Sequence, residues 1–352
     1  MVEPLMRLEN LGRTFSTGRG PVPAVDDISL DLFAGRVTCL VGESGSGKTT
    51  TARMAAGLTE PTAGRILLDG TDIGSLTGRA RMAYRLAVQY IHQDPYASLN
   101  PTRTVASALT SPLRKHRLAK GRGGALAKAT ELLELVDLRP ADYYLRRYPH
   151  QLSGGQRQRV SVARALTTNP RLIIADEATS MLDVSVRLSM LNMLGTLRDT
   201  LNVGFLFITH DLALAKYFGW EGEIAVMYLG RIVERGPTRE VIGDPQHPYT
   251  RALLEAIPEP APDLTRAKRA TQLRSADTPS LLAIPRGCPF HPRCPVYRQG
   301  KCDTVLPQLS SDGGGSDEHL AACLRLAAVK REMPLFTDAN GLGRAGREGA
   351  KP

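Results

Sequence analysis

The chain has 352 residues, of which 42% are hydrophobic and 23% charged, and its formal net charge is +10. This length allows a large buried core and suggests two domains, or one large domain with an extension. No apolar run approaches the roughly 20 residues of a membrane-spanning helix, and the N-terminus lacks a signal pattern. We therefore expect a cytosolic chain that is made without export.

The positive charge gathers in two stretches, 114–122 and 266–274. Aromatic residues make up only 5% of the chain and do not interleave with these stretches, so stacking on nucleic-acid bases is poorly supported. We interpret the basic stretches as solvated loops; proximity to anionic lipid headgroups is the alternative.

The N-terminal region predicts an antiparallel pair of strands. Alternating apolar runs at 5–11 and 25–32 are separated by glycine and proline. Phe15 lies between them and could stack on an adenine, although a core or surface phenylalanine is the more frequent outcome.

Residues 42–49 are the most informative stretch. They form a complete G-x-x-x-x-G-K-[ST] between a predicted buried strand, 37–41, and a predicted helix, 50–56. The glycines let successive N–H groups point at a phosphate, and the helix N-terminus adds its dipole. Lys48 is expected to reach the terminal phosphates, and Thr49 to ligate Mg²⁺. The alternative, an ordinary glycine-rich turn, does not account for both flanking elements. The predicted nucleotide-binding residues are Phe15, Gly42, Glu43, Ser44, Gly45, Ser46, Gly47, Lys48, Thr49 and Thr50.

The middle of the chain continues the alternation of strands and helices. Residues 65–69 and 87–91 read as strands, and the second is followed by Gln93. Residues 104–169 look mainly helical, with an amphipathic pattern over 126–138. Ser153 is a plausible N-cap for a helix that runs from Gln156. The apolar residues that carry the amphipathic pattern are Leu126, Ala129, Leu132, Leu133, Val136 and Leu138.

Two further buried strands end in polar side chains. The run 172–175 ends at Asp176 and Glu177, and the run 205–208 is followed by His210, with a predicted helix, 185–201, between them. This alternation implies a mainly parallel α/β sheet, in which ligands bind at the carboxyl ends of the strands.

Phosphoryl transfer needs neutralised charge and a positioned water, and these polar residues can supply both. We expect Asp176 to hold Mg²⁺ directly or through water, and Glu177 to polarise the attacking water. His210 is expected to contact the γ-phosphate, and Gln93 the metal or the water. Each residue alone has an ordinary structural explanation, but four such features at one sheet edge favour an active site. The predicted catalytic residues are Lys48, Gln93, Glu177 and His210.

The whole pattern resembles the ATP-binding subunits of ABC transporters. The matching motifs are the Walker A loop at 42–49, the glutamine loop at Gln93, the signature at 152–156, the Walker B strand at 172–177, the D-loop at 180–183 and the switch residue His210. The resemblance implies a P-loop α/β core with an antiparallel β subdomain and a helical subdomain. It favours Phe15 as the adenine-stacking residue.

In that family two ATPase subunits face each other head to tail, and each ATP lies between one subunit's Walker A loop and the other's signature. The resemblance therefore implies that four signature residues serve the partner's nucleotide. They are Ser153, Gly154, Gly155 and Gln156.

Four segments look like the oligopeptide/dipeptide importer branch: 93–101, 226–231, 247–250 and 287–295. This implies ATP-driven uptake through two membrane permease subunits, with a substrate-binding protein outside. The chain would lie at the cytoplasmic face of the membrane and would bind no nucleic acid. Its partner is expected to be a second, different ATP-binding subunit.

Two alternatives remain open for the function. Residues 179–183 and 210–218 look similar to a subset associated with oligosaccharides, so an oligosaccharide is the alternative cargo. A soluble ABC ATPase that acts on nucleic acid is the second alternative. Such proteins usually join two ATPase halves or carry a coiled-coil insertion, whereas this chain has one set of motifs and no heptad run.

The predicted domains are an ATP-binding domain over 1–258, with its helical subdomain at about 104–169, a C-terminal extension over 259–332 and a flexible tail over 333–352.

Four of the five cysteines fall in the extension, and Cys39 is predicted to be a core residue. Four thiolates in a loop-rich segment could gain order from a metal. Their spacing lacks the paired C-x-x-C of zinc ribbons and the common ferredoxin runs. The clustered cysteines are Cys288, Cys294, Cys302 and Cys323.

In the importers that this chain resembles, the extension is cysteine-rich and in some members holds a [4Fe–4S] cluster. We therefore expect such a cluster here, with Zn²⁺ or free reduced thiols as the alternatives.

Overall fold

The computed structural model describes residues 3–18, 20–94, 98–257, 272–311 and 316–333. The chain forms two compact units that divide between Arg231 and Ile232, and each is described by itself. The predicted boundary after residue 258, the predicted tail beyond residue 333 and part of the 93–101 motif lie outside the described residues. In the part of the chain that is described, no helix combines the length and the apolar character that crossing a membrane requires.

A parallel sheet forms the core of the first unit. Its strands lie in the order β9, β3, β8, β7, β6, and every neighbouring pair is parallel. All residues of β3, β7 and β8 are buried, as expected for parallel strands covered on both faces. The bounds are Val37–Val41 for β3, Val88–Ile91 for β6, Leu172–Asp176 for β7, Gly204–Thr209 for β8 and Glu223–Tyr228 for β9.

An antiparallel sheet in the order β2, β1, β4, β5 completes the β structure of this unit. The predicted pairing of the two N-terminal runs is confirmed, although both strands extend further toward their hairpin than expected. The bounds are Met6–Thr17 for β1, Gly20–Leu32 for β2, Ala63–Leu68 for β4 and Thr71–Asp72 for β5.

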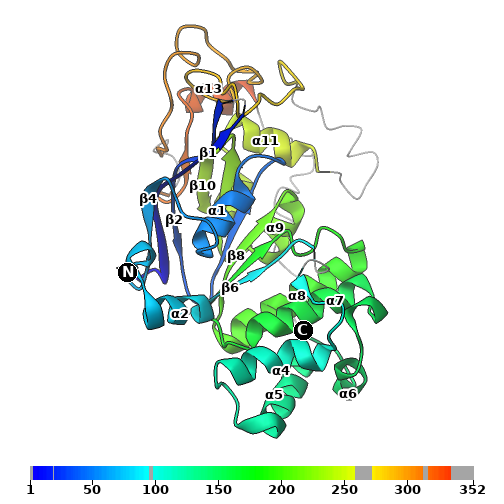
Figure 1. Ribbon diagram of the computed structural model, residues 1–352. Coiled ribbons are helices and arrows are strands. Elements are labelled where there is room, and N and C mark those ends of the chain that lie inside the picture. The colour runs from blue at the N-terminus through cyan, green and yellow to red at the C-terminus, as the bar shows by residue number, and fades with distance from the viewer. Residues whose placement is uncertain (1–2, 19, 95–97, 258–271, 312–315, 334–352) are drawn as a thin grey trace. The chain divides into compact units, whose positions relative to one another are not determined.

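Helices connect the strands and build a separate helical subdomain (Figure 1). In Figure 1, α4, α5 and α6 gather at the lower end of the unit, away from α1. The connecting helices are α1 (Lys48–Ala55), the 3₁₀ turn η1 (Ile73–Ser75), α2 (Gly78–Ala87), α8 (Val184–Leu201) and α9 (Leu212–Phe218). The subdomain contains α4 (Val105–Lys115), α5 (Gly121–Leu135), α6 (Ala141–Leu145), the 3₁₀ turn η2 (Pro149–Gln151) and α7 (Gly154–Leu166).

One core assignment in the helical region is wrong. Leu126 was expected on the apolar face of its helix, but its side chain is 46% exposed. The buried stripe of α5 instead runs through Ala125, Ala129, Leu132 and Leu133. Leu126 lies one residue past the first of these and therefore at the edge of the stripe, where a helical side chain turns toward solvent.

The second unit contains short elements joined by long irregular segments. Strand β10 (Arg231–Pro237, whose first residue belongs to the first unit) pairs antiparallel with β11 (Leu320–Ala321). Helices α10 (Thr238–Gly243), α11 (Pro248–Glu255) and α13 (Leu326–Glu332) complete it. Residues 272–311 form turns and bends apart from one isolated bridge at Ser310, which agrees with the loop-rich extension that the sequence predicts.

The side chain of His247 caps α11. Its Nδ1 accepts a hydrogen bond from the backbone N–H of Tyr249 at 3.1 Å. Burial lowers the pKa of His247 to about 3, so the ring is neutral and has the lone pair that this acceptor role requires.

A buried carboxylate organises the interior of the second unit. Glu234, on β10, has no exposed surface. Its Oε1 lies 2.8 Å from Nε2 of His319 and accepts the backbone N–H of Gln246 at 2.6 Å. Its Oε2 accepts the backbone N–H of His247 at 3.0 Å. Both carboxylate oxygens are therefore satisfied, which is the condition for burying a charge at tolerable cost.

We predict that Glu234→Ala destabilises the protein by about 3–5 kcal/mol, because it leaves buried polar partners without an acceptor. Denaturant unfolding of the full chain followed by circular dichroism measures this. The control is Asp31→Ala, which removes an exposed ion pair with Arg7 and should cost at most about 1 kcal/mol. Equal destabilisation by the two variants would contradict the prediction.

Candidate active site

The phosphate loop joins β3 to α1, and two of its glycines are required by close backbone approaches. A Cβ at Gly42 would lie 2.1 Å from the carbonyl oxygen of Met227, and one at Gly47 would lie 2.2 Å from that of Ala24. Gly47 also has φ +104° as the N-cap of α1, a region that side-chain-bearing residues rarely adopt. The loop therefore keeps the curled shape that presents N–H groups to a phosphate.

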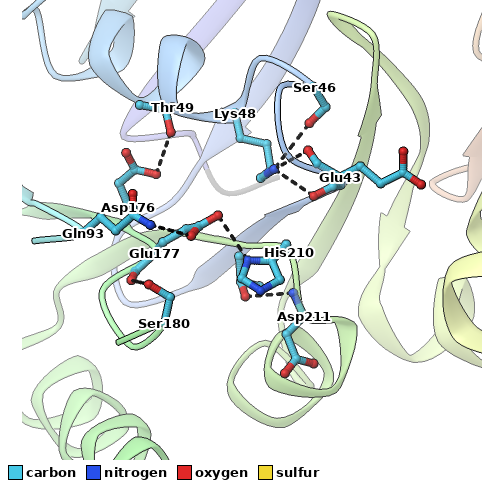
Figure 2. A network of polar contacts seen from close by, with 12 residues as sticks. Glu43, Ser46, Lys48, Thr49, Gln93, Asp176, Glu177, Ser180, His210 and Asp211 are labelled. Carbon is cyan, nitrogen blue, oxygen red and sulfur yellow. Dashed lines mark hydrogen bonds and ion pairs between the residues drawn. The ribbon is translucent and has the colours of Figure 1, made fainter. Parts of the chain in front are cut away.

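Lys48 is held by the backbone of its own loop (Figure 2). Its Nζ donates to the carbonyl oxygens of Gly42 and Glu43, both at 2.8 Å, and lies 3.4 Å from Oγ of Ser46. Only 5% of the residue is exposed, and this desolvation lowers its pKa, while the charges of Glu177 and Asp176 oppose the shift. The ammonium is thus placed at the loop beside two acidic residues.

Asp176, the last residue of β7, accepts hydrogen bonds at both carboxylate oxygens. Oδ1 accepts from the hydroxyl of Thr49 at 3.1 Å, and Oδ2 accepts from the hydroxyl of Tyr90 at 2.5 Å. Burial raises the pKa of Asp176, and the two hydrogen bonds oppose that shift. Oxygens of a carboxylate and a hydroxyl are the ligands that Mg²⁺ prefers, so Thr49 and Asp176 fit the predicted metal site.

Glu177 follows β7, and its carboxylate contacts side chains that follow the two neighbouring strands, β6 and β8. Its Oε2 accepts from Nε2 of Gln93, after β6, at 3.0 Å, and its Oε1 lies 3.2 Å from Nδ1 of His210, after β8 (Figure 2). Its backbone has φ +46°, and its carbonyl oxygen accepts from the Ser180 hydroxyl at 2.9 Å. Gln93, Asp176, Glu177 and His210, predicted to share one sheet edge, therefore lie together.

The signature residues form the start of α7. The Ser153 hydroxyl accepts from the backbone N–H of Gln156 at 3.3 Å, and Oε1 of Gln156 accepts from the N–H of Ser153 at 3.0 Å. This reciprocal capping confirms Ser153 as the N-cap. A Cβ at Gly155 would lie 2.6 Å from Cγ1 of Val186 on α8, so any residue other than glycine would force Val186 to move.

Phe15 lies on β1 with 37% of its surface exposed, and the guanidinium of Arg13 sits 4.8 Å from the centre of its ring. Its stacking on adenine, and the service of the signature to a partner's nucleotide, stay predictions. The other predicted loop residues, Glu43, Ser44, Gly45, Ser46 and Thr50, belong to the same loop and to the first turn of α1.

Sequence reasoning missed Tyr90. The available signal was its position in a strand three residues before Gln93, but a tyrosine in a buried strand is normally interpreted as core. In the parallel register of β6 and β7, Tyr90 pairs with Ile174, two residues before Asp176, so Tyr90 and Asp176 share one face of the sheet.

Two family models match the chain. One, described as ABC transporter, matches residues 25–180, and another, described as oligopeptide/dipeptide transporter, C-terminal region, matches residues 233–302. A putative peptide import ATP-binding protein of Brucella ovis is 42% identical over 322 residues, which cover 92% of this chain and 98% of that protein. The chain belongs to the ATP-binding proteins of ABC transporters. The glutathione import ATP-binding protein of Escherichia coli K12 is 46% identical over 285 residues, which cover 79% of this chain and 45% of that protein.

A solved structure agrees with this family. A dimeric ATP-binding cassette in a post-hydrolysis state, bound to ADP and Pi, is 28% identical and superposes with a TM-score of 0.60 over 66% of this chain and 99% of its own. The predicted fold class is confirmed, and as an ABC ATP-binding protein the chain is an ATPase that uses Mg²⁺.

The four clustered cysteines of the second unit line one small cavity. Burial raises the pKa of Cys288 and of Cys294 to about 12 and that of Cys323 to about 11, so these thiols are protonated at neutral pH. Across the described residues, no three or more His, Cys, Asp or Glu side chains are arranged to hold a metal ion. The side chains as they lie therefore form no ready ligand set for the expected [4Fe–4S] cluster or for Zn²⁺, and no comparison names either group, so the metal centre stays a prediction. Cys39 is buried within β3, as predicted.

Proposed function

We propose that this ATPase drives the import of oligopeptides or dipeptides as a peripheral subunit on the cytoplasmic side of two membrane permease subunits. The observation that carries the catalytic part is the carboxylate of Glu177, which lies between Gln93 and His210 beside the phosphate loop. The matches to peptide-import proteins and to the oligopeptide/dipeptide C-terminal region support the cargo.

Substrate binding begins at the phosphate loop. The loop N–H groups and the N-terminus of α1 would take the phosphates of ATP, and Lys48 would exchange its contacts with the carbonyls of Gly42 and Glu43 for phosphate oxygens. Thr49 and Asp176 would hold Mg²⁺, which supplies neutralising charge on the phosphates.

Hydrolysis needs a base and groups that orient it. Glu177 would accept the proton of the attacking water, because its carboxylate is the acidic group at the strand ends that is not committed to Thr49 and Tyr90. Gln93 and His210 each contact one oxygen of that carboxylate and would fix its direction and the position of the water.

We propose that two ATP-binding subunits, this chain and a second and different one, close head to tail, so that Ser153, Gly154, Gly155 and Gln156 contact the nucleotide of the partner. The capped N-terminus of α7 supports this role, because a helix N-terminus favours the negative charge of a phosphate. Phe15, exposed on β1, would stack on the adenine of the chain's own nucleotide. An external substrate-binding protein would deliver the cargo.

We predict that Glu177→Gln lowers the ATPase rate at least about 100-fold while ATP still binds, because the variant loses the base and keeps the phosphate loop. Phosphate release by the assembled pair of ATP-binding subunits measures the rate, and size-exclusion chromatography of that pair with ATP detects the trapped closed dimer. The control is Glu131→Gln, on the exposed side of α5, which should hydrolyse ATP normally. Hydrolysis by Glu177→Gln at a near-normal rate would refute the role given to Glu177.

The cargo is tested with the assembled transporter. Co-purification with membrane subunits distinguishes an importer from a soluble ATPase that acts on nucleic acid. In proteoliposomes, we expect ATP-dependent uptake of labelled dipeptides or oligopeptides in the presence of the binding protein, and none of an oligosaccharide. Uptake of the oligosaccharide alone would replace peptide as the cargo.

We further propose that the four cysteines hold a metal centre, a [4Fe–4S] cluster in preference to Zn²⁺. Their convergence on one cavity and the affinity of thiolates for both groups support this, although the side chains, as they lie, do not form a ready ligand set.

We predict iron and the broad visible absorption of a cluster in protein purified without oxygen. Cys302→Ser should lose the iron and the absorption, because it removes one of the four clustered thiols. The control is Cys39→Ser, which changes a cysteine of β3 outside this cluster and should keep the iron and the absorption. Elemental analysis and absorption spectra make the measurement. If the protein contains zinc and no iron, the four cysteines bind Zn²⁺ instead of a cluster. If it contains neither metal, the proposal is wrong and the cysteines are free thiols.

A further inference from the structure

Tyr90 connects strand β6, which precedes the glutamine loop, to Asp176, the carboxylate that we propose to hold Mg²⁺. Its hydroxyl donates to Oδ2 of Asp176 at 2.5 Å, across the parallel pair of β6 and β7. A hydrogen bond to an ionised carboxylate is shorter and stronger than one between neutral groups. Tyr90 is therefore a strong and direct contact of Asp176.

The ring of Tyr90 is held in place by a neighbouring side chain. It packs edge to face on His92, with the ring centres 4.7 Å apart. This packing keeps the tyrosine hydroxyl directed at Oδ2 of Asp176.

The two oxygens of Asp176 consequently have different surroundings. Oδ2 is occupied by Tyr90, whereas Oδ1 faces the Thr49 hydroxyl of the phosphate loop. Without the tyrosine hydroxyl, the carboxylate could turn about its last torsion angle and lose the orientation of Oδ1. A partner that fixes the orientation of a metal-binding carboxylate raises the affinity for the metal.

We propose that Tyr90 is a positioning residue for Mg²⁺: it holds Asp176 so that Oδ1, beside Thr49, faces the metal that accompanies ATP. This inference rests on the role proposed above for Asp176. It adds a residue outside the recognised motifs, and it assigns Tyr90 no contact with the nucleotide.

The test compares ATP affinity with and without Mg²⁺ in the Glu177→Gln background, where ATP is not consumed. A fluorescent ATP analogue is titrated in EDTA and again in excess Mg²⁺. Tyr90→Phe should leave the affinity in EDTA unchanged and should reduce the Mg²⁺-dependent gain in affinity about tenfold. The matched control is Tyr84→Phe, which removes another buried tyrosine hydroxyl, here bonded to the carbonyl of Ala55 at 2.5 Å, and should retain the full gain.

Three results would overturn the inference. These are an unchanged Mg²⁺-dependent gain in Tyr90→Phe, an equal loss of affinity in EDTA and in Mg²⁺, and equal behaviour of Tyr84→Phe. Asp176→Ala, measured in parallel, distinguishes failure of the metal role of Asp176 from failure of the positioning role of Tyr90. If it keeps the gain, the metal role of Asp176 fails as well; if it loses the gain while Tyr90→Phe keeps it, only the inference about Tyr90 fails.

Discussion

The parallel register of the central sheet is the constraint on which the site depends. Val41 pairs with Thr209, Ala175 pairs with Phe207, and Ile91 pairs with Ala175, so the carboxyl ends of four strands reach one edge together. Strands β6, β7 and β8 each supply a polar side chain within two residues of their ends, and β3 leads directly into the phosphate loop. Because strand side chains alternate between faces, a slip of one residue in β7 would move the Asp176 side chain to the opposite face.

The electrostatics of the site follow from this convergence. Lys48 lies beside Asp176 and Glu177, at the end of β7, and bonds to carbonyl oxygens of its own loop. An incoming phosphate can replace these carbonyls without rebuilding the loop. Glu177 is 17% exposed, whereas His210 is 56% exposed, so the site is open on the side of the histidine. An open flank beside the carboxylate that we propose to be catalytic agrees with the proposal that a second subunit completes the site.

The sequence predicted those parts of the site whose chemistry lies in a short local pattern. The phosphate loop, the cap at Ser153 and the acidic end of β7 each depend on neighbouring residues, and their placement follows from strand and helix periods alone. Tyr90 could not be found in this way, since its contact with Asp176 depends on which strands pair and in which register. The prediction that Leu126 lies on the apolar face was wrong for a related reason. Whether a helical residue is buried depends on where the buried stripe of the whole helix runs.

In the second unit, the spacing of the cysteines in the sequence did not predict that they lie together in space. The separations of the four cysteines resembled no common motif, yet the chain brings all four to one cavity. Interactions that need no metal already support this unit, since Glu234 is bonded to His319 and to two backbone N–H groups. Because burial raises the pKa of Cys288, Cys294 and Cys323, a metal that binds there must displace their protons. The metal binding proposed for the extension would therefore compete with protons within an already supported fold, and its affinity would rise with pH.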